Sequence, residues 1–242
     1  MSIHCESIYV LGGHALSLEY LERLLRAQKE RLIDFKNLYY IDDSTECIAA
    51  KKIEKQAKQI LKSYDDFLLS LLESPESKEN HFIIPDHTAP HVLFRLFLNL
   101  LEKKSKTTQS KVIPYDTDLK LPFQKLLDSG ICALSFATWI CPIDCDEPEH
   151  CPGIDNTRTW DFRKTFEHYD QKDPAKSIHL FYCDQLAYGV VGISSQKLCK
   201  EWNSFEQRVT ELKKAPLSLE VATFTKCHGI IGRAEIMSLR TK

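Results

Sequence analysis

The chain has 242 residues, of which 43% are hydrophobic and 27% are charged, and its formal net charge is −2. The length allows one large domain or two small ones, and the near-balanced charge gives no electrostatic basis for binding nucleic acid or an anionic membrane surface. The apolar runs are too short to span a bilayer and no secretory signal is visible, so we expect a cytoplasmic protein.

Strand-like and helix-like segments alternate along the first part of the chain. Short apolar runs bounded by turn residues predict strands, and apolar residues at helical spacing predict helices. The predicted elements, in order, are a strand at 8–11, a helix at 18–33, a strand at 37–41, a helical stretch in two pieces at 46–72, a strand at 81–84 and a helix from Pro90 to Leu101. This alternation predicts a parallel sheet with crossover helices.

The second part of the chain follows a polar stretch at 103–110, which reads as a linker or surface loop. Beyond it the pattern predicts an extended segment at 111–115, strands at 130–137, 178–183 and 218–225, and helices at 160–168 and 196–212. We therefore expect an α/β protein with one domain at 1–103 and an α/β domain at 111–242 that carries a cysteine-rich loop, unless the two form one continuous domain.

The first predicted strand ends in Gly12-Gly13 and leads into a helix. This opening resembles the start of a Rossmann nucleotide-binding domain, as in dehydrogenases and in the regulatory subunits of potassium-uptake systems. His14 and Ser17 stand where that pattern has its second and third glycines, so the match is a degenerate one. The resemblance implies a Rossmann-like parallel sheet and a small-molecule or nucleotide ligand, NAD(P) among the candidates, near Gly12, Gly13 and Asp42.

Three cysteines, Cys141, Cys145 and Cys151, lie within eleven residues, and the first and last precede a proline. Proline fixes φ and removes a backbone donor, which predicts a stiff loop. Thiolates clustered in this way in a reducing compartment usually hold zinc or an iron–sulfur cluster. The sequence therefore predicts a metal site on this loop.

A closed site needs a fourth ligand, and Cys227 at the end of the strand at 218–225 is the best candidate. His150 and His228 are the alternative fourth ligands. The spacing matches neither a zinc ribbon nor a bacterial ferredoxin, and we favour an iron–sulfur cluster over zinc. The chain has nine cysteines in all. The isolated ones are expected to be small buried residues: Cys5, Cys47, Cys132, Cys183 and Cys199.

The order of these features resembles a group of uncharacterised prokaryotic proteins. They join a Rossmann-like front half to a Cys-Pro-rich metal loop and a late Cys-His-Gly. The matching residues here are Cys141-Pro142, Cys145, Pro148, Cys151-Pro152, Trp160 and Cys227-His228-Gly229. The resemblance covers most of the chain, but it implies no particular activity.

Two histidines are candidates for proton transfer. His91 and its neighbour His87 follow the strand at 81–84, so in a doubly wound sheet they would line the crevice near Gly12. His228 directly follows Cys227. The leading hypothesis is a redox protein or oxidoreductase with a cysteine-ligated iron–sulfur site, in which His91 or His228 handles protons. The alternatives are a zinc-stabilised ligand-sensing or interaction module without catalytic activity, and an inactive scaffold. The sequence does not indicate an oligomeric state.

Overall fold

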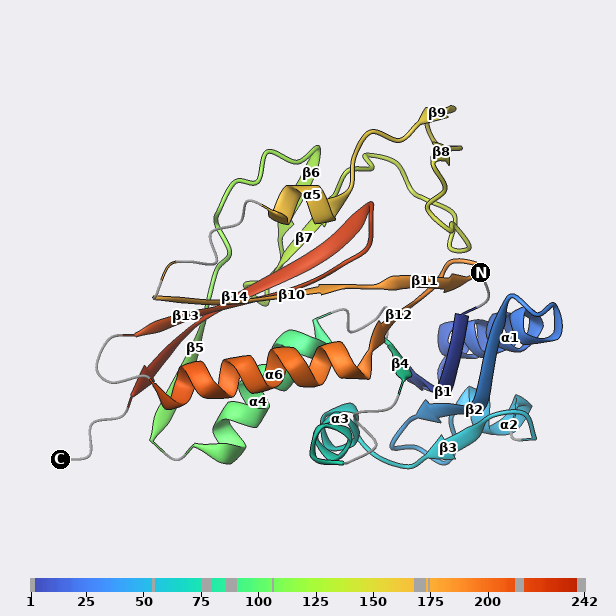
Figure 1. The fold of residues 1–242 in the computed structure, drawn as a ribbon, viewed down its shortest axis with the longest axis horizontal. Helices are drawn as coiled ribbons and strands as arrows, with labels where there is room; N and C mark the ends of the chain where they lie inside the picture. The colour runs from blue at the N-terminus through green and yellow to red at the C-terminus, as the bar shows by residue number, and fades with distance from the viewer. Residues whose placement is uncertain are drawn as a thin grey trace. The chain divides into compact units, whose positions relative to one another are not determined.

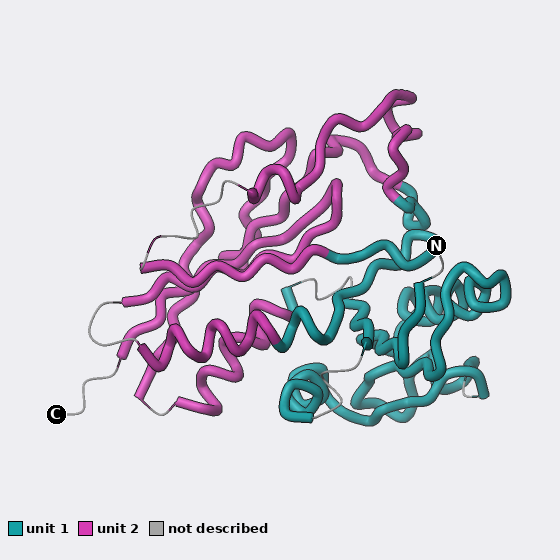
Figure 2. Tube along the Cα trace, in the orientation of Figure 1, with its two compact units in different colours: residues 1–92, 142–146, 183–199 teal, residues 93–141, 147–182, 200–242 magenta. Residues whose placement is uncertain are grey.

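The computed structural model describes residues 3–53, 55–74, 80–85, 91–105, 107–167, 173, 175–211 and 216–238. The described residues form a mixed α/β protein with six helices and fourteen strands (Figure 1). They divide into two compact units, each assembled from three stretches of the chain (Figure 2). Unit 1 comprises Met1–Val92, Pro142–Asp146 and Cys183–Cys199, and unit 2 comprises Leu93–Cys141, Glu147–Tyr182 and Lys200–Lys242. No helix in the described part of the chain has the length and apolar character that a bilayer crossing requires.

Unit 1 is built around a six-stranded sheet with the order β11-β12-β4-β1-β2-β3. Its strands are β1 (Ile3–Leu11), β2 (Ile33–Ile41), β3 (Lys58–Ile60), β4 (His81–Ile84), β11 (Asp184–Ala187) and β12 (Val190–Ser194). The four strands from the front of the chain pair in parallel, whereas β12 runs antiparallel to β4 and to β11. The expected parallel pairing of the first strands is therefore present within a sheet that is mixed as a whole.

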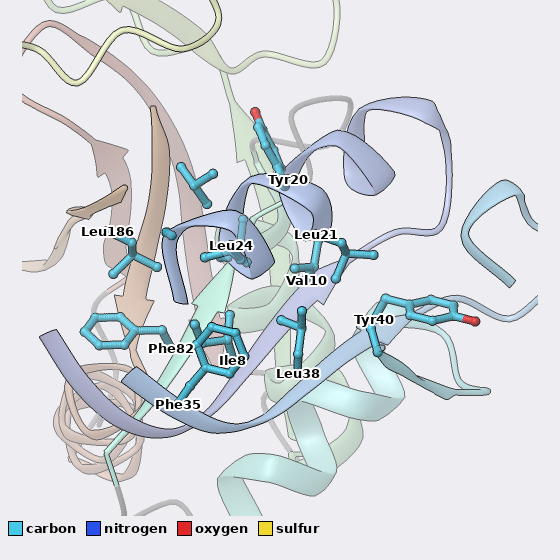
Figure 3. Packing of buried hydrophobic residues seen from close by; sticks show 14 of the residues in the cluster. Ile8, Val10, Tyr20, Leu21, Leu24, Phe35, Leu38, Tyr40, Phe82 and Leu186 are labelled. Carbon is cyan, nitrogen blue, oxygen red and sulfur yellow. The ribbon is translucent and has the colours of Figure 1, made fainter. Parts of the chain in front are cut away.

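Three helices belong to unit 1, namely α1 (Ala15–Lys29), α2 (Ile48–Lys52) and α3 (Tyr64–Glu73). Helix α1 buries Leu18, Leu21 and Leu24, whose spacing of three residues places them on one helical face. This face meets the apolar side chains of β1, β2 and β4 (Figure 3). The sheet is therefore covered by α1, a helix whose sequence is amphipathic.

The element boundaries in unit 1 differ from the sequence expectation at two places. The predicted helix 18–33 ends at Lys29, because Ile33 is the buried first residue of β2 rather than the last turn of a helix. The predicted helical stretch 46–72 contains β3, whose backbone pairs with β2. In both cases pairing with the sheet overrides a local helical pattern. Pro90 and His87 lie outside the described residues, so the expected helix start at Pro90 is not tested.

Unit 2 contains a second six-stranded sheet with the order β10-β13-β14-β7-β6, in which β5 also pairs with β14. Its strands are β5 (Thr108–Ile113), β6 (Phe123–Leu126), β7 (Cys132–Ser135), β10 (Lys176–Tyr182), β13 (Leu217–Phe224) and β14 (His228–Ser238). A separate two-stranded ladder joins β8 (His150–Cys151) to β9 (Asn156–Thr157). The polar stretch 103–110, which we expected to be a linker or surface loop, overlaps the start of β5. This strand pairs with the second half of β14.

Helices cover both faces of this second sheet. The helices α4 (Val92–Lys104) and α6 (Ser195–Thr210) contribute Phe97, Trp202 and Phe205, whose rings contact one another. Phe97 also packs on Phe181 of β10. A second apolar cluster includes Phe162 and Phe166 of α5 (Phe162–Glu167) and Phe224 of β13. These two clusters fix the sheet whose β13–β14 turn carries Cys227.

Candidate functional site

The turn after β1 requires glycine at two positions. Gly12 has a φ of +110°, a conformation that residues with a side chain rarely adopt. A Cβ at Gly12 would lie 2.5 Å from Ser17 Oγ, and a Cβ at Gly13 would lie 2.6 Å from Cys47 Sγ. Neighbouring side chains therefore approach this turn more closely than any other residue type would allow.

Asp42 joins this turn to the end of β2. Its Oδ2 accepts a hydrogen bond of 2.8 Å from the Gly13 amide, and its Oδ1 accepts one of 2.9 Å from the Ser44 amide. The structure thus brings Gly12, Gly13 and Asp42 together at the carboxyl ends of two neighbouring parallel strands. Each carboxylate oxygen can accept one further hydrogen bond, which a ligand hydroxyl could donate.

His14 takes the N-cap position of α1. Its Nδ1 accepts a hydrogen bond of 3.5 Å from the Ser17 amide, and its Nε2 lies 3.2 Å from Ser17 Oγ. In a Rossmann domain the start of this helix receives the pyrophosphate of a dinucleotide. Asp42 could accept hydrogen bonds from a ribose, but the His14 side chain already caps the helix start, where that domain holds the pyrophosphate. We therefore derive no catalytic step through NAD(P).

Cys227 occupies the tight turn between β13 and β14 in unit 2. Its side chain is buried, and its Sγ accepts hydrogen bonds from Trp160 Nε1 at 3.3 Å and from Arg158 Nη1 at 3.8 Å. Burial, followed by the charge of Glu147, raises the pKa of the Cys227 thiol to about 11, against the effect of these two donors. The buried sulfur is therefore surrounded by hydrogen-bond donors as well as by apolar atoms.

Glu147 holds the Cys227 turn in place. It is 5% exposed and has a φ of +48°. Its carboxylate accepts hydrogen bonds from the amides of Lys226 at 2.8 Å and Cys227 at 3.1 Å, and from the Thr225 hydroxyl. Arg158 Nη1 in turn donates to the Glu147 carbonyl at 2.6 Å. Glu147 is not among the site residues predicted from the sequence, because no local signal distinguishes it from its acidic neighbours in the cysteine loop.

Aromatic rings surround the donors to Cys227. Trp160 stacks on Phe136 with ring centroids 6.0 Å apart and meets Trp139 edge-on at 6.3 Å. A Cβ at Gly153 would lie 2.2 Å from Trp139 Nε1, so Gly153 provides the space that this ring occupies. The cysteine loop is thereby packed against the same aromatic group that contains the Trp160 donor.

His228 lies next to Cys227 and points toward β7. Its Nδ1 is 3.1 Å from the hydroxyl of Ser135. Burial lowers the pKa of His228, although the charge of Glu147 acts in the opposite direction. At neutral pH the ring is therefore uncharged, with one nitrogen bonded to a hydroxyl and able to exchange a proton with it.

The cysteines of the loop are divided between the two units. Cys141 and Cys151 belong to unit 2, where Cys151 is buried in β8, and Cys145 belongs to unit 1. The segment Pro142–Asp146 is fixed within unit 1 by Arg23, whose Nη1 donates to the carbonyls of Ile143 and Tyr188 at 3.0 Å.

The remaining site candidates lie as follows. His150 bonds Asp155 at the surface, and His91 precedes α4 in unit 1. Among the described residues, no group of three or more His, Cys, Asp or Glu side chains is arranged to hold a metal ion. Metal ligation by Cys141, Cys145, Cys151 and Cys227 therefore stays a prediction.

The comparisons with known proteins identify one family. No curated protein and no solved structure matches the chain. The model of the AF_1314_C family, described as "Uncharacterized protein, C-terminal domain", matches residues 89–237. The matched region includes the cysteine loop, Trp160 and the turn at Cys227. Because it spans more than half of the chain, the protein belongs to this family.

Proposed function

We propose that the protein is a cytoplasmic redox protein or oxidoreductase with an iron–sulfur site, in which Cys227 is a ligand. The observation that carries this proposal is the environment of the Cys227 sulfur. It is buried, yet it accepts hydrogen bonds from an indole and from a guanidinium. Cys141 and Cys151 are the further ligands in the same unit, and Cys145 is the fourth that the loop sequence provides.

The hydrogen bonds to Cys227 favour a sulfur that carries negative charge. A structural thiol in a core packs well against carbon and gains little from two N–H donors. A metal-bound sulfur is a thiolate, and N–H donors to it are a usual means of setting the potential of a cluster. Burial nevertheless raises the pKa of the free thiol to about 11, so a metal ion would have to displace a proton in order to bind this sulfur.

The protein's own residues would support the cluster in different ways. Glu147 fixes the backbone that presents Cys227, and Trp160 and Arg158 donate hydrogen bonds to its sulfur. A bound cluster would supply one-electron transfer. His228, uncharged and bonded to Ser135, is the group adjacent to Cys227 that can accept a proton, and His91 stays a candidate for the same role in unit 1.

We further propose that unit 1 is Rossmann-like and binds a small molecule or nucleotide at Gly12, Gly13 and Asp42. The strand order β3-β2-β1-β4 and the parallel pairing of these strands support this proposal, because it is the order of the first four strands of a Rossmann sheet. A titration with NADH, followed by the nucleotide's fluorescence, tests the dinucleotide. If a mononucleotide binds and NADH does not, the result would agree with a helix start that the His14 side chain blocks to a pyrophosphate.

Anaerobic purification followed by elemental analysis is the experiment that tests the metal proposal. We expect brown protein that contains iron and acid-labile sulfide, and loss of both in Cys227→Ser. Cys199→Ser is the matched control, since this isolated cysteine lies on α6 and should leave the metal content unchanged. Zinc without redox activity would support the interaction module instead, and protein free of all metals would overturn the proposal.

A further inference from the structure

A cavity of about 290 Å³ lies between the C-terminal turns of α4 and α6 and the strand β5. It belongs to unit 2 and contains none of the residues assigned above to the metal or nucleotide sites. Its apolar lining residues are Trp202, Phe205 and Leu101, which are buried, and Val209, which is half-buried. Of the described residues that line it, Lys104 is the one cation and Glu206 the one anion. The cavity is therefore a separate place where a ligand could meet both aromatic and charged groups.

The side chain of Lys104 shows what kind of group this cavity accepts. Its Nζ lies 2.9 Å from Glu206 Oε1 and 5.4 Å from the centre of the Trp202 ring. A carboxylate together with the face of an indole is a typical environment for an ammonium group. The Lys104 and Glu206 side chains are 40% and 46% exposed, so the Lys104 side chain can move into solvent while the helices stay folded. The chain's own ammonium thus marks a cation position at the edge of the cavity.

The helix ends add to the same preference. Helix α4 ends at Lys104 and α6 ends at Thr210, and residues from both final turns line the cavity. The C-terminal end of a helix carries partial negative charge from carbonyls that lack a helical donor. These ends and the Glu206 carboxylate favour a cation, although Lys103 and Lys104 in the last turn of α4 and Arg208 in that of α6 act in the opposite direction.

We propose that the cavity binds a small organic ammonium compound, primary or quaternary, with a short aliphatic part. Its charged group takes the position of Lys104 Nζ, between Trp202 and Glu206. Its aliphatic part contacts Val209 and the exposed edge of Trp202. The side chain of Lys104 then competes with the ligand for the same position. This inference is independent of the metal proposal, because it uses a different surface of unit 2.

The test is a titration of the full-length protein with choline and with n-butylamine, followed by ligand-observed NMR. n-Butanol is the uncharged match, and glucose tests whether the hydroxyl side chains of the cavity select a sugar instead. We expect both amines to bind and the two neutral compounds not to bind. Glu206→Gln should weaken amine binding about tenfold, as the loss of a charge-assisted hydrogen bond implies.

Two further variants separate recognition from simple damage. Lys104→Met removes the competing ammonium and should tighten choline binding several-fold, and Lys104→Gln serves as a second version if the first is unstable. Glu211→Gln is the control, because Glu211 directly follows α6 but does not line the cavity. The proposal is overturned if choline binds neither the wild type nor Lys104→Met. It is also overturned if Glu206→Gln binds choline with the affinity of the wild type, or if n-butanol or glucose binds the wild type as tightly as choline does.

Discussion

The turn at Gly12 in unit 1 and the turn at Cys227 in unit 2 are both held by a carboxylate that accepts backbone amides. Asp42 accepts two amides, lies partly exposed, and is 29 residues from Gly13. Glu147 accepts two amides and a hydroxyl, is buried, and comes from a segment 80 residues before Cys227. The first arrangement leaves a carboxylate accessible to a ligand. The second uses the carboxylate entirely for positioning a sulfur.

Among the substitutions that test this comparison, Glu147→Ala should lower the free energy of unfolding the most. The substitution leaves two amides and a hydroxyl without their buried acceptor, so we expect a loss of about 3 kcal/mol in the free energy of unfolding. Urea denaturation of the purified protein measures it. Glu149→Ala, at an exposed neighbouring position, should change stability by less than about 0.5 kcal/mol. Equal stabilities for the two variants would contradict the role assigned to Glu147.

Gly12→Ala should have the next largest effect. Alanine is strained at a φ of +110°, and its Cβ would lie 2.5 Å from Ser17 Oγ. We expect destabilisation of about 2 kcal/mol, measured in the same denaturation experiment. Metal content should not change, because the Gly12 turn contains none of the proposed cysteine ligands. A variant as stable as the wild type would show that this turn tolerates a side chain.

Asp42→Ala should cost less than Glu147→Ala, because its two amide partners can bond water instead. We expect about 1 kcal/mol. The same substitution should weaken any nucleotide that binds at this turn, which equilibrium titration of wild type and variant would measure. If Asp42→Ala proved as destabilising as Glu147→Ala, the contrast between an accessible and a buried carboxylate would be wrong.

Trp160→Phe should have the smallest effect on stability and sharpens the role of Cys227. Phenylalanine retains an aromatic ring next to Phe136 but removes the N–H that bonds the sulfur. We expect a change in unfolding free energy below about 1 kcal/mol. In anaerobically prepared protein the reduction potential of the proposed cluster should shift, with the metal content largely retained. Trp202→Phe, remote from Cys227 in the sequence and on α6, should leave that potential unchanged.

The sequence identified the parts of the molecule that depend on neighbours along the chain. The buried run before Gly12, the helical spacing of Leu18, Leu21 and Leu25, and the acidic residue after β2 are local signals. They correctly place the turn at Gly12 next to Asp42. Periodicity and turn chemistry are sufficient where consecutive elements are also neighbours in space.

The features that the sequence analysis missed depend on distant pairing. The strand β3 lies inside a helical pattern and exists because it extends the sheet beside β2. Strands β11 and β12 form a hairpin through Gly189, which has a φ of +74°, and β12 then pairs with β4. The burial of Glu147 depends on amides 80 residues away. No pattern within a short window contains such information.

The pairing of β12 with β4 has a consequence for how the protein can be divided. The family match begins at residue 89, whereas β4 (His81–Ile84) precedes it. A fragment limited to 89–237 would keep the β11–β12 hairpin and lose the strand beside it, together with Arg23, which anchors the Ile143 carbonyl. The bare edge would then be open to association between copies. Proteolytic trimming back to the family boundary should therefore yield aggregates rather than a working smaller protein.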